Sequence, residues 1–465
     1  MSSERKSVAI IGGGVAGMSA ACALAESGYA VRLFERRGYL GGRASSYLHP
    51  GVNEVLDNCQ HALFGCCTNL LGFYDRIGVR EKIHWTSTMT MIEPGGKRSE
   101  LGPVALPAPL HGLPKLMTAS AFTLADKLAL ARAFSAMMRP VPANSTENLA
   151  AWLERHGQTE GALQRFWRLV IASALNAELE EIAVPYAAKV IRELFMNSAW
   201  AGAMGMSTVP LSELYAGVPE YLTTRGGSLE LLAHVEGCTW DASTQQWAIT
   251  TRTGVFAADY IISALPFEGL QKLLPVLPVT EGVPHLQAQL EQHRHWPICS
   301  VHVWFDRPVT DLEHAVLLDR EMHWMYNQSK LQGRPGNYLE MVISATRRIA
   351  ALERKTAIDL ALSELAEFFP LVREAKVEKV ALIKEVRATF GVAPGIDAAR
   401  PAATDAPWPN FFLAGDWTRT GWPSTMESAA RSGHLAAEAV AEAAGKPQRW
   451  LVADLKPQGL MRLLG

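Results

Sequence analysis

The chain has 465 residues, with 44 lysines and arginines against 46 aspartates and glutamates, and therefore a formal net charge of −2. Hydrophobic residues make up 48% and charged residues 19% of the sequence. This balance excludes a disordered chain and a nucleic-acid-binding protein that depends on bulk positive charge. The six cysteines form no CxxC pair, so we expect neither a disulfide scaffold nor a metal site.

We expect no targeting signal at the start of the chain. Its first apolar run, residues 8–11, is far shorter than the roughly 7–15 residues that a signal peptide needs. No window of about 18 apolar residues without charges follows, so no membrane-spanning helix is expected. We therefore expect a cytoplasmic protein.

The first predicted unit is a strand, a helix and a second, parallel strand. Residues 8–11 are typical of a short buried strand, and residues 18–27 have helical spacing that ends at Gly28. Residues 30–35 predict the second strand. This order is the opening of a parallel sheet.

A glycine motif lies between the first strand and the helix. Gly12, Gly14 and Gly17 fit the pattern G-x-G-x-x-G, and Glu35 follows at the expected distance of about 20 residues. The glycines allow a tight turn, close approach of a pyrophosphate and close helix packing, while the acid accepts hydrogen bonds from a ribose diol. An ordinary glycine turn is the alternative, but the flanking strand and helix favour dinucleotide binding.

The rest of the chain alternates between helical and strand patterns. Residues 101–138 are rich in Leu, Ala and Met and are interrupted by prolines, and helical patterns follow between about 145 and 200. Strands are predicted at residues 227–235, 246–251, 255–263, 298–305, 338–344 and 411–414, and helices at 350–368 and 424–444.

Two further motifs indicate which dinucleotide is bound. Gly41-Gly42-Arg43 follows Glu35, and residues 411–417 and 421–427 place Asp416 after a strand and Thr425 before a helix. Together the three motifs resemble those of the flavin amine oxidase/phytoene desaturase superfamily, which implies FAD as the cofactor. The residues that the resemblance assigns to FAD are Gly12, Gly14, Ala16, Gly17, Glu35, Arg36, Gly42, Arg43, Val235, Gly415, Asp416, Thr425 and Met426.

Strand patterns at both chain ends predict an α/β fold with a discontinuous, Rossmann-like FAD-binding domain. We place this domain at residues 1–80, 215–275 and 385–445. An inserted α+β substrate domain of mixed sheet and helices is expected at residues 81–214 and 276–384. A C-terminal tail covers residues 446–465.

One branch of the superfamily is resembled along essentially the whole chain. The segments that carry the likeness are residues 56–61, 174–176, 190–192, 210–214 and 297–309. They are similar to the squalene-associated FAD-dependent desaturases, the hydroxysqualene dehydroxylases of bacterial hopanoid biosynthesis. One departure is Cys59, which occupies the place of a glycine in that branch. Amine oxidation is disfavoured because no lysine lies between Lys272 and Lys330, and Thr425 replaces an aromatic residue.

The implied reaction is reductive removal of an allylic hydroxyl, which needs a general acid, a dry apolar channel and aromatic rings beside a passing cation. We predict His61 as the acid, with Asp57 second; a positioning or flavin-contacting role is the alternative for His61. Asn58 and Gln60 are expected to orient the hydroxyl, bind the flavin or cap a turn. The predicted channel residues are Asn176, Trp296, Trp304, Trp324 and Tyr326, with ordinary core packing as their alternative.

The substrate of such an enzyme, hydroxysqualene, is a hydrophobic isoprenoid that resides in the bilayer, so we expect peripheral association with the cytoplasmic membrane surface. Two stretches are candidates for membrane contact. These are the apolar stretch 101–138 and the tail from Trp450 to Leu464. Packing of each stretch on its own domain is the alternative. The electron donor that reduces FAD is not identified by the sequence, and no nucleic-acid partner is expected.

Two other functions stay open. A carotenoid-type desaturase shares the fold and the hydrocarbon substrate but removes hydrogen instead of adding it. A non-catalytic prenyl-binding chaperone would keep the fold without flavin chemistry. Retention of all three cofactor motifs favours an enzyme over the chaperone.

Overall fold

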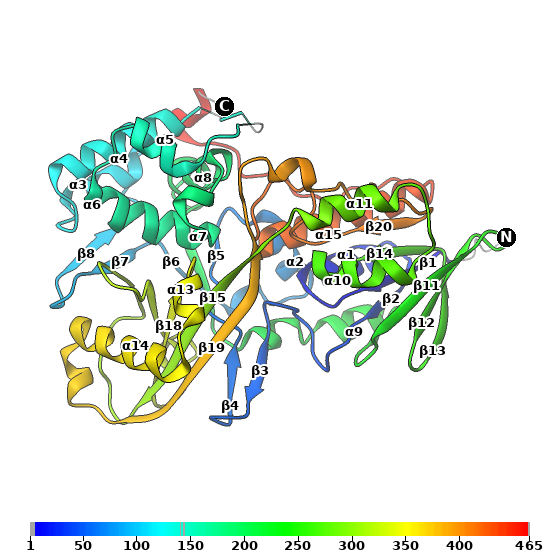
Figure 1. Cartoon of the computed structure of the whole chain (residues 1–465), viewed down its shortest axis with the longest axis horizontal. Helices are drawn as coiled ribbons and strands as arrows, with labels where there is room; N and C mark the ends of the chain where they lie inside the picture. Colours follow the sequence, from blue (N-terminus) through cyan, green and yellow to red (C-terminus); the bar gives the residue numbers. More distant parts are fainter. Residues whose placement is uncertain (1–4, 140, 143–144, 464–465) are drawn as a thin grey trace.

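The computed structural model of the chain describes residues 5–139, 141–142 and 145–463 (Figure 1). Residues 1–4, 140, 143–144 and 464–465, which belong to the predicted first domain, inserted domain and tail, lie outside the described residues. The chain forms two main parts, which the long strand β19 (Val377–Phe390) connects (Figure 1). The first part is built on a parallel sheet and the second on a mixed sheet.

The parallel sheet has five strands in the order β10-β2-β1-β14-β20. Its strands are β1 (Ser7–Ile11), β2 (Ala30–Phe34), β10 (Ser228–Glu230), β14 (Tyr260–Ser263) and β20 (Phe411–Leu413). Strands from three distant stretches of sequence therefore meet in one sheet. Helices α1 (Val15–Glu26) and α15 (Met426–Ala443) pack against each other, and a Cβ on Gly433 would lie 2.2 Å from the carbonyl oxygen of Ala16.

A three-stranded antiparallel sheet lies beside the parallel one and corrects two predictions. Its strands are β11 (Val235–Asp241), β12 (Gln246–Thr251) and β13 (Gly254–Ala258). Val235 begins a strand instead of ending one. The single strand predicted at 255–263 is two strands in two sheets, because the carboxylate of Asp259 between them accepts hydrogen bonds from Ser7 N–H and Ser7 Oγ, both 2.8 Å, and directs the chain to β1.

The second part contains a seven-stranded sheet in the order β19-β15-β18-β17-β16-β7-β8. Its remaining strands are β7 (Met89–Ile92), β8 (Arg98–Leu101), β15 (His295–Phe305), β16 (His314–Leu317), β17 (Trp324–Asn327) and β18 (Asn337–Ile343). The helix predicted at 350–368 is two helices, α13 (Arg347–Ala351) and α14 (Arg354–Phe368), because Leu352 leaves the helical conformation. Helix α14 covers one face of this sheet.

Helices between β8 and β9 (Met204–Ser207) form a separate layer at one end of the molecule (Figure 1). They are α3 (Leu113–Thr118), α4 (Leu124–Met137), α5 (Leu149–Arg155), α6 (Glu160–Ala162), α7 (Ala172–Leu175) and α8 (Val184–Val190), with π-helical turns η3 (Leu163–Ile171) and η5 (Ile191–Met196). Phe134, Phe166, Trp167 and Phe195 hold this layer together through ring contacts.

Shorter elements complete the chain. They are β3 (Ser46–His49), β4 (Glu54–Asp57), β5 (Leu63–Phe64), α2 (Thr68–Arg76), β6 (Ile83–Thr86), η2 (Leu110–Gly112), α9 (Val218–Thr223), α10 (Phe267–Leu273), α11 (Val283–Glu291), α12 (Gln328–Leu331) and η10 (Gly459–Leu463). The predicted α/β fold with an additional mixed sheet and helices is confirmed. The exact domain boundaries stay a prediction. Within the described ranges, no helix is both long enough and apolar enough to cross a bilayer.

Candidate active site

The glycine motif forms a turn without side chains between β1 and α1. Gly12 has a φ of +113°, and its N–H donates to the carbonyl of Phe34 at 2.8 Å. A Cβ on Gly17 would lie 1.9 Å from the carbonyl oxygen of Gly12, so only glycine allows this close packing of helix and turn. Gly14 precedes α1 without a side-chain cap. The first N–H groups of α1 are thus available to a phosphate.

The second glycine pair faces the first motif. The Gly41 N–H donates to the Gly13 carbonyl at 2.9 Å, and a Cβ on Gly42 would lie 3.2 Å from Gly14 Cα. The buried carboxylate of Glu35 accepts hydrogen bonds from the Gly13 N–H at 2.8 Å and the Arg37 N–H at 2.7 Å. These bonds fix the acid at the end of β2, where a ribose would lie beside a pyrophosphate on α1.

Arg43 links the second motif to the C-terminal one. Its guanidinium forms an ion pair with Asp416 and donates to the Ala388 carbonyl at 3.0 Å. Burial opposes ionisation of Asp416, but the charge of Arg43 and a hydrogen bond from Ser424 outweigh it and hold the pKa of Asp416 below its usual value. A half-buried cation and a buried anion are therefore fixed beside the glycine turns.

The last motif positions the start of α15. Thr425 Oγ1 accepts from the Ser428 N–H at 3.1 Å and so caps the helix, with Met426 as its first residue. The carboxylate of Glu427 accepts from the N–H groups of Asn69 and Leu70 and caps α2. The segment 411–427 therefore brings a helix N-terminus toward the Arg43–Asp416 pair.

Arg400 is a supporting residue that sequence reasoning missed. It is fully buried and donates to the carbonyls of Asp416, at 3.0 Å, and of Trp417 and Thr418. These bonds hold the turn that carries the last motif. No local sequence pattern predicts this role of Arg400. Its acceptors are backbone carbonyls, and only folding brings them around one guanidinium.

These features fit FAD. Two glycine turns without side chains flank one site, so a cofactor can approach their backbone closely. The N-terminus of α1 supplies N–H groups without a side-chain cap, and Glu35 lies where it can bind a ribose diol. Of the other residues assigned to the cofactor, Ala16 is buried in α1 and Arg36 is exposed. Gly415 begins the turn after β20 with a φ of +140°, and Val235 is buried at the start of β11. Their individual contacts with FAD stay predictions.

The loop of residues 57–61, on which the closest resemblance depends, starts at the cofactor site. Asp57 Oδ1 accepts from Ser46 Oγ at 2.6 Å and the Leu211 N–H at 3.0 Å, and burial raises the pKa of Asp57 to about 6. Asn58 Nδ2 donates to the Arg43 carbonyl and to Glu385 Oε2, both at 3.0 Å. The loop is thus bonded directly to the arginine of the second motif.

His61 and Cys59 lie in the same loop. His61 Nδ1 donates to the Cys59 carbonyl at 2.8 Å, and burial lowers the pKa of His61. At pH 7 this ring is therefore neutral, with its proton on Nδ1 and a lone pair on Nε2. The arrangement suits proton acceptance; the acid role stays a prediction that first requires protonation of Nε2. Cys59 has a φ of +64°, a left-handed conformation that explains why a glycine suits this position.

Three of the four predicted channel aromatics lie on one face of the seven-stranded sheet. The strand register pairs Trp304 with Tyr338 and places Tyr326 and Trp324 beside the next positions of β18. Trp324 stacks on Tyr326 with ring centroids 6.0 Å apart, and Trp304 stacks on Tyr338 at 4.3 Å. We call this the aromatic face, and the opposite face, which packs on α14, the apolar face.

The other two predicted channel residues lie together at the far end of β15. The Trp296 ring packs 3.7 Å from the guanidinium carbon of Arg347. Asn176 has a left-handed φ of +49°; its Nδ2 donates to Thr389 Oγ1 at 2.8 Å and to the Trp296 carbonyl at 3.3 Å, and its Oδ1 accepts from the Ala345 N–H at 2.6 Å. These bonds account for the buried amide without a ligand, and its substrate contact stays a prediction.

A buried polar cluster on the aromatic face was not predicted. Gln328 Nε2 donates to Gln60 Oε1 and to Glu340 Oε2, both at 2.6 Å. The two ring nitrogens of His302 each form one hydrogen bond. Nε2 bonds to Ser300 Oγ at 2.8 Å, and Nδ1 bonds to the Tyr338 hydroxyl at 2.7 Å. The strand pattern is the signal that could have found Glu340, because it is an acid in the middle of a mostly apolar strand. Gln60 thus joins the loop of the cofactor site to the aromatic face.

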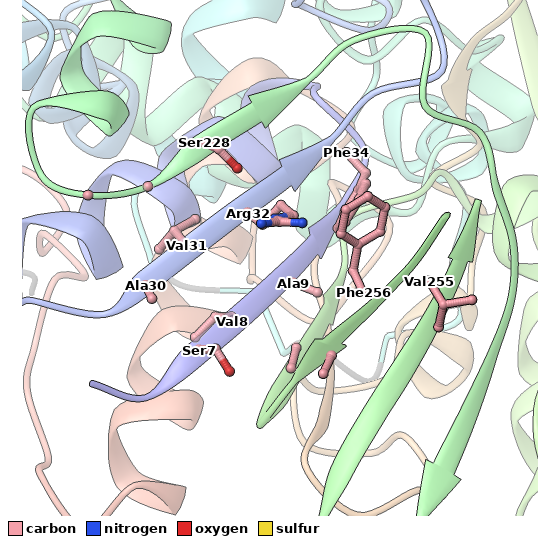
Figure 2. A pocket seen from close by; sticks show the side chains of 14 residues that line it. Ser7, Val8, Ala9, Ala30, Val31, Arg32, Phe34, Ser228, Val255 and Phe256 are labelled. Carbon is pink, nitrogen blue, oxygen red and sulfur yellow. The ribbon is translucent and has the colours of Figure 1, made fainter. Parts of the chain in front are cut away.

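A surface depression of about 380 Å³ lies elsewhere, between the parallel sheet and β13. Arg32 and Phe256 both line it and lie against each other (Figure 2), with the guanidinium carbon 4.4 Å from the ring centroid. None of the predicted catalytic, channel or cofactor residues lines it. It is therefore separate from the site described above.

Comparison with known proteins agrees with this geometry. The model of the family of flavin-containing amine oxidoreductases matches residues 15–441. A 15-cis-phytoene desaturase of Synechococcus elongatus is 25% identical over 457 residues, which cover 93% of this chain and 95% of that protein. A zeta-carotene desaturase of Synechocystis is 25% identical over 477 residues, covering 93% and 96%.

Solved structures share the fold. An oxidoreductase from Methanosarcina mazei superposes with a TM-score of 0.71 at 17% identity and covers 94% of this chain and 100% of that one. Putrescine oxidase bound to putrescine superposes with a TM-score of 0.69 at 15% identity, with 95% and 98% covered. At this identity the likeness extends to the fold alone.

Proposed function

The chain belongs to the family of flavin-containing amine oxidoreductases and is an FAD-dependent oxidoreductase, and on that premise we propose that it is a hydroxysqualene dehydroxylase. The observation that carries the proposal is the position of the loop 57–61. This loop bears the most specific resemblance, and it bonds to Arg43 at the cofactor site and to Gln328 on the aromatic face. These two bonds support the proposal, because a cofactor held at Arg43 and a substrate held on the aromatic face would both adjoin this loop.

The proposed reaction replaces an allylic hydroxyl by hydrogen. A proton joins the hydroxyl oxygen, the carbon–oxygen bond breaks with its electron pair, water leaves, and the carbon receives a hydride. Reduced FAD supplies that hydride, and a two-electron reductant must restore it. The chain's own contribution is to hold the hydrocarbon against Trp304, Trp324 and Tyr326, whose ring faces stabilise positive charge, and to exclude water.

Amine oxidation is less consistent with these residues. The position before Met426 holds Thr425, a small helix cap, where an amine oxidase carries an aromatic ring. The aromatic face also carries no lysine on β15, β17 or β18. The hydrocarbon reaction therefore accounts better for this site than oxidation of a cationic amine.

A carotenoid-type desaturase is the second candidate, favoured by the two desaturases that match along nearly the whole chain. Desaturation removes hydrogen from the hydrocarbon and needs oxidised FAD, whereas dehydroxylation needs reduced FAD. The two reactions therefore run in opposite redox directions with the same cofactor, and one experiment separates them.

The test is a single-turnover assay without oxygen. The purified FAD-loaded enzyme is reduced with dithionite and mixed with hydroxysqualene, and we expect squalene to form as the flavin absorbance returns. Oxidised enzyme mixed with phytoene is the parallel arm. Formation of desaturated carotenoid there, with no squalene in the first arm, would replace the proposal by the second candidate. A protein that retains no reducible flavin would point to the prenyl-binding chaperone.

We also propose that this enzyme docks on the membrane through the two predicted stretches together. The Leu460 N–H of η10 donates to the Ala108 carbonyl at 2.8 Å, so the tail lies against the first stretch. Large apolar side chains there are exposed between 40% and 82%: Leu106, Leu110, Leu113, Met117, Leu124, Leu128, Leu460 and Leu463. We call these residues the docking patch. Such a concentration of exposed apolar side chains suits a lipid surface.

The start of the tail is held by internal contacts. The N–H groups of Trp450 and Leu451 donate to Glu438 Oε1 at 2.7 Å, and Asp454 pairs with Arg431 at 2.7 Å. Removal of residues 450–465 would therefore break internal contacts as well as membrane contact. Point substitutions on the docking patch are the sharper test.

The double variant Leu124→Glu/Leu128→Glu should lose most of its binding to phosphatidylethanolamine/phosphatidylglycerol vesicles in a flotation assay. The two residues are one helical turn apart on α4 and are 64% and 59% exposed, so the fold should tolerate the change. The control is Val279→Glu, which alters a 96% exposed residue outside the patch and should float like the wild type. Equal flotation of all three proteins would remove the docking patch from the proposal.

A further inference from the structure

Glu340 has an unusual place in the structure for an acidic side chain. It lies in the middle of β18 on the aromatic face and is 0% exposed. One carboxyl oxygen, Oε2, accepts from Gln328 Nε2 at 2.6 Å, while Oε1 has no hydrogen-bond partner. A buried polar atom without a partner costs stability, so its retention needs a reason beyond packing.

The groups around Glu340 do not neutralise a negative charge. Among the described residues, the only basic group within 4.0 Å is His302, and burial lowers the pKa of His302 to about 3, so that ring is uncharged. Tyr326 faces Glu340 from β17, and the loop places Asp57 on the same side. Burial and the charge of Asp57 raise the pKa of Glu340 to about 8, against the opposing effect of the hydrogen bond from Gln328. Glu340 is therefore protonated at pH 7.

A second buried glutamate in the same part of the molecule differs from Glu340 in its hydrogen bonding. Glu364 lies on α14 at the apolar face and is 5% exposed. Its two oxygens accept from the N–H groups of Glu321, at 3.2 Å, and Met322, at 2.9 Å. These bonds explain Glu364 as a structural group that ties a turn to a helix. No such bond explains Oε1 of Glu340.

Glu340 is also connected to the cofactor site. Gln328 bridges it to Gln60, and the same loop bonds to Arg43 through Asn58. Trp324 and Tyr326 stack beside it on the neighbouring strand. A weak acid, aromatic rings and the loop that reaches the flavin motifs are thus assembled on one face, as a reaction through an allylic cation needs.

We infer that Glu340 is the catalytic acid that protonates the departing hydroxyl; the inference rests on the proposed dehydroxylation. The O–H bond of Glu340 breaks as its proton moves to the hydroxyl oxygen. The carbon–oxygen bond then breaks with its electron pair, and water leaves. The carbon gains a hydride, the chemistry that reduced FAD would supply when bound, and the Glu340 carboxylate regains a proton from water. Gln328 holds Oε2, which leaves Oε1 for the substrate.

The test compares Glu340→Gln with the matched control Glu364→Gln. Single-turnover formation of squalene by dithionite-reduced enzyme should fall by about 10²- to 10⁴-fold in Glu340→Gln, because the amide cannot donate a carboxylic proton. The FAD content and flavin spectrum should stay those of the wild type. Glu364→Gln should keep the wild-type rate.

The wild-type enzyme supplies a second measurement that needs no variant. Its single-turnover rate should fall as the pH rises through about 8, where Glu340 loses its proton. A fall centred below pH 6.5 would instead indicate His61, whose pKa is lowered. Infrared difference spectra of wild type minus Glu340→Gln should show the C=O stretch of a protonated carboxyl at pH 7, and this band should weaken as the pH rises through about 8.

The outcomes separate this inference from the function on which it rests. If the wild type forms no squalene, the proposed function fails and the inference fails with it. If the wild type forms squalene but Glu340→Gln reacts at the same rate, or the rate does not fall between pH 7 and 9, only the assignment of Glu340 is overturned. Absence of the infrared band likewise overturns it.

Discussion

Along β18, Leu339, Met341 and Ile343 pack against α14, whereas the alternate residues Tyr338, Glu340 and Val342 turn to the aromatic face. The same alternation on β15 separates Val301 and Val303 from polar and aromatic neighbours. Every strand residue is equally part of the sheet, yet one face is mainly apolar and the other contains the fully buried polar groups Ser300, His302 and Glu340.

The two faces of the seven-stranded sheet therefore have different roles, one in packing and the other in the proposed chemistry. Apolar side chains on one face remove surface from water and supply stability without further partners. Buried Ser300, His302 and Glu340 on the other face cost desolvation that only hydrogen bonds or function can offset. The face that is less favourable for folding is therefore the better candidate for the reaction.

The largest expected effect on stability comes from the apolar face. Met341→Ala removes a fully buried side chain and should lower the free energy of unfolding by about 2–5 kcal/mol, since a cavity replaces lost contacts. Urea unfolding measures the loss. The single-turnover rate of the folded, FAD-loaded variant should equal that of the wild type. A large loss of rate in folded Met341→Ala would break the proposed division between the faces.

The next effect concerns charge stabilisation on the aromatic face. Trp324→Leu should slow single turnover by about 3- to 30-fold, because a cation–π contribution of about 0.5–2 kcal/mol is lost. Trp324→Phe keeps a ring and should retain most of the rate, which controls for the change in size. Equal slowing in both variants would show that Trp324 acts by filling space.

The smallest expected effect lies in the loop that covers the aromatic face. Cys59 is buried against Tyr338, and its left-handed φ of +64° strains a residue with a Cβ. Both Cys59→Ala and Cys59→Gly lose the thiol, but only glycine relieves the strain. Cys59→Gly should therefore be about 1 kcal/mol more stable to urea than Cys59→Ala. The reverse order would show that the loop carries no such strain.

The sequence predicted the elements whose signals are local. The glycine turn, the neighbouring strands β1 and β2, and β12 follow from spacing and alternation, and β12 has the predicted bounds. The run 255–263 could not be divided in advance, since its apolar pattern is continuous and the change of sheet depends on the contact of Asp259 with Ser7. Trp304, Trp324 and Tyr326 could be proposed as a set from residue type, but only strand register puts them on one face.

By itself the sequence determined the fold class and the cofactor, because glycines at fixed spacing and an acid after the second strand specify a backbone shape that few other functions need. The tertiary structure decided which acid is protonated. The pKa of Glu340 depends on the burial and charges that β15, β17, α12 and the loop 57–61 bring around it. Those groups are distant in sequence, and desolvation has no local signature in a chain of residues.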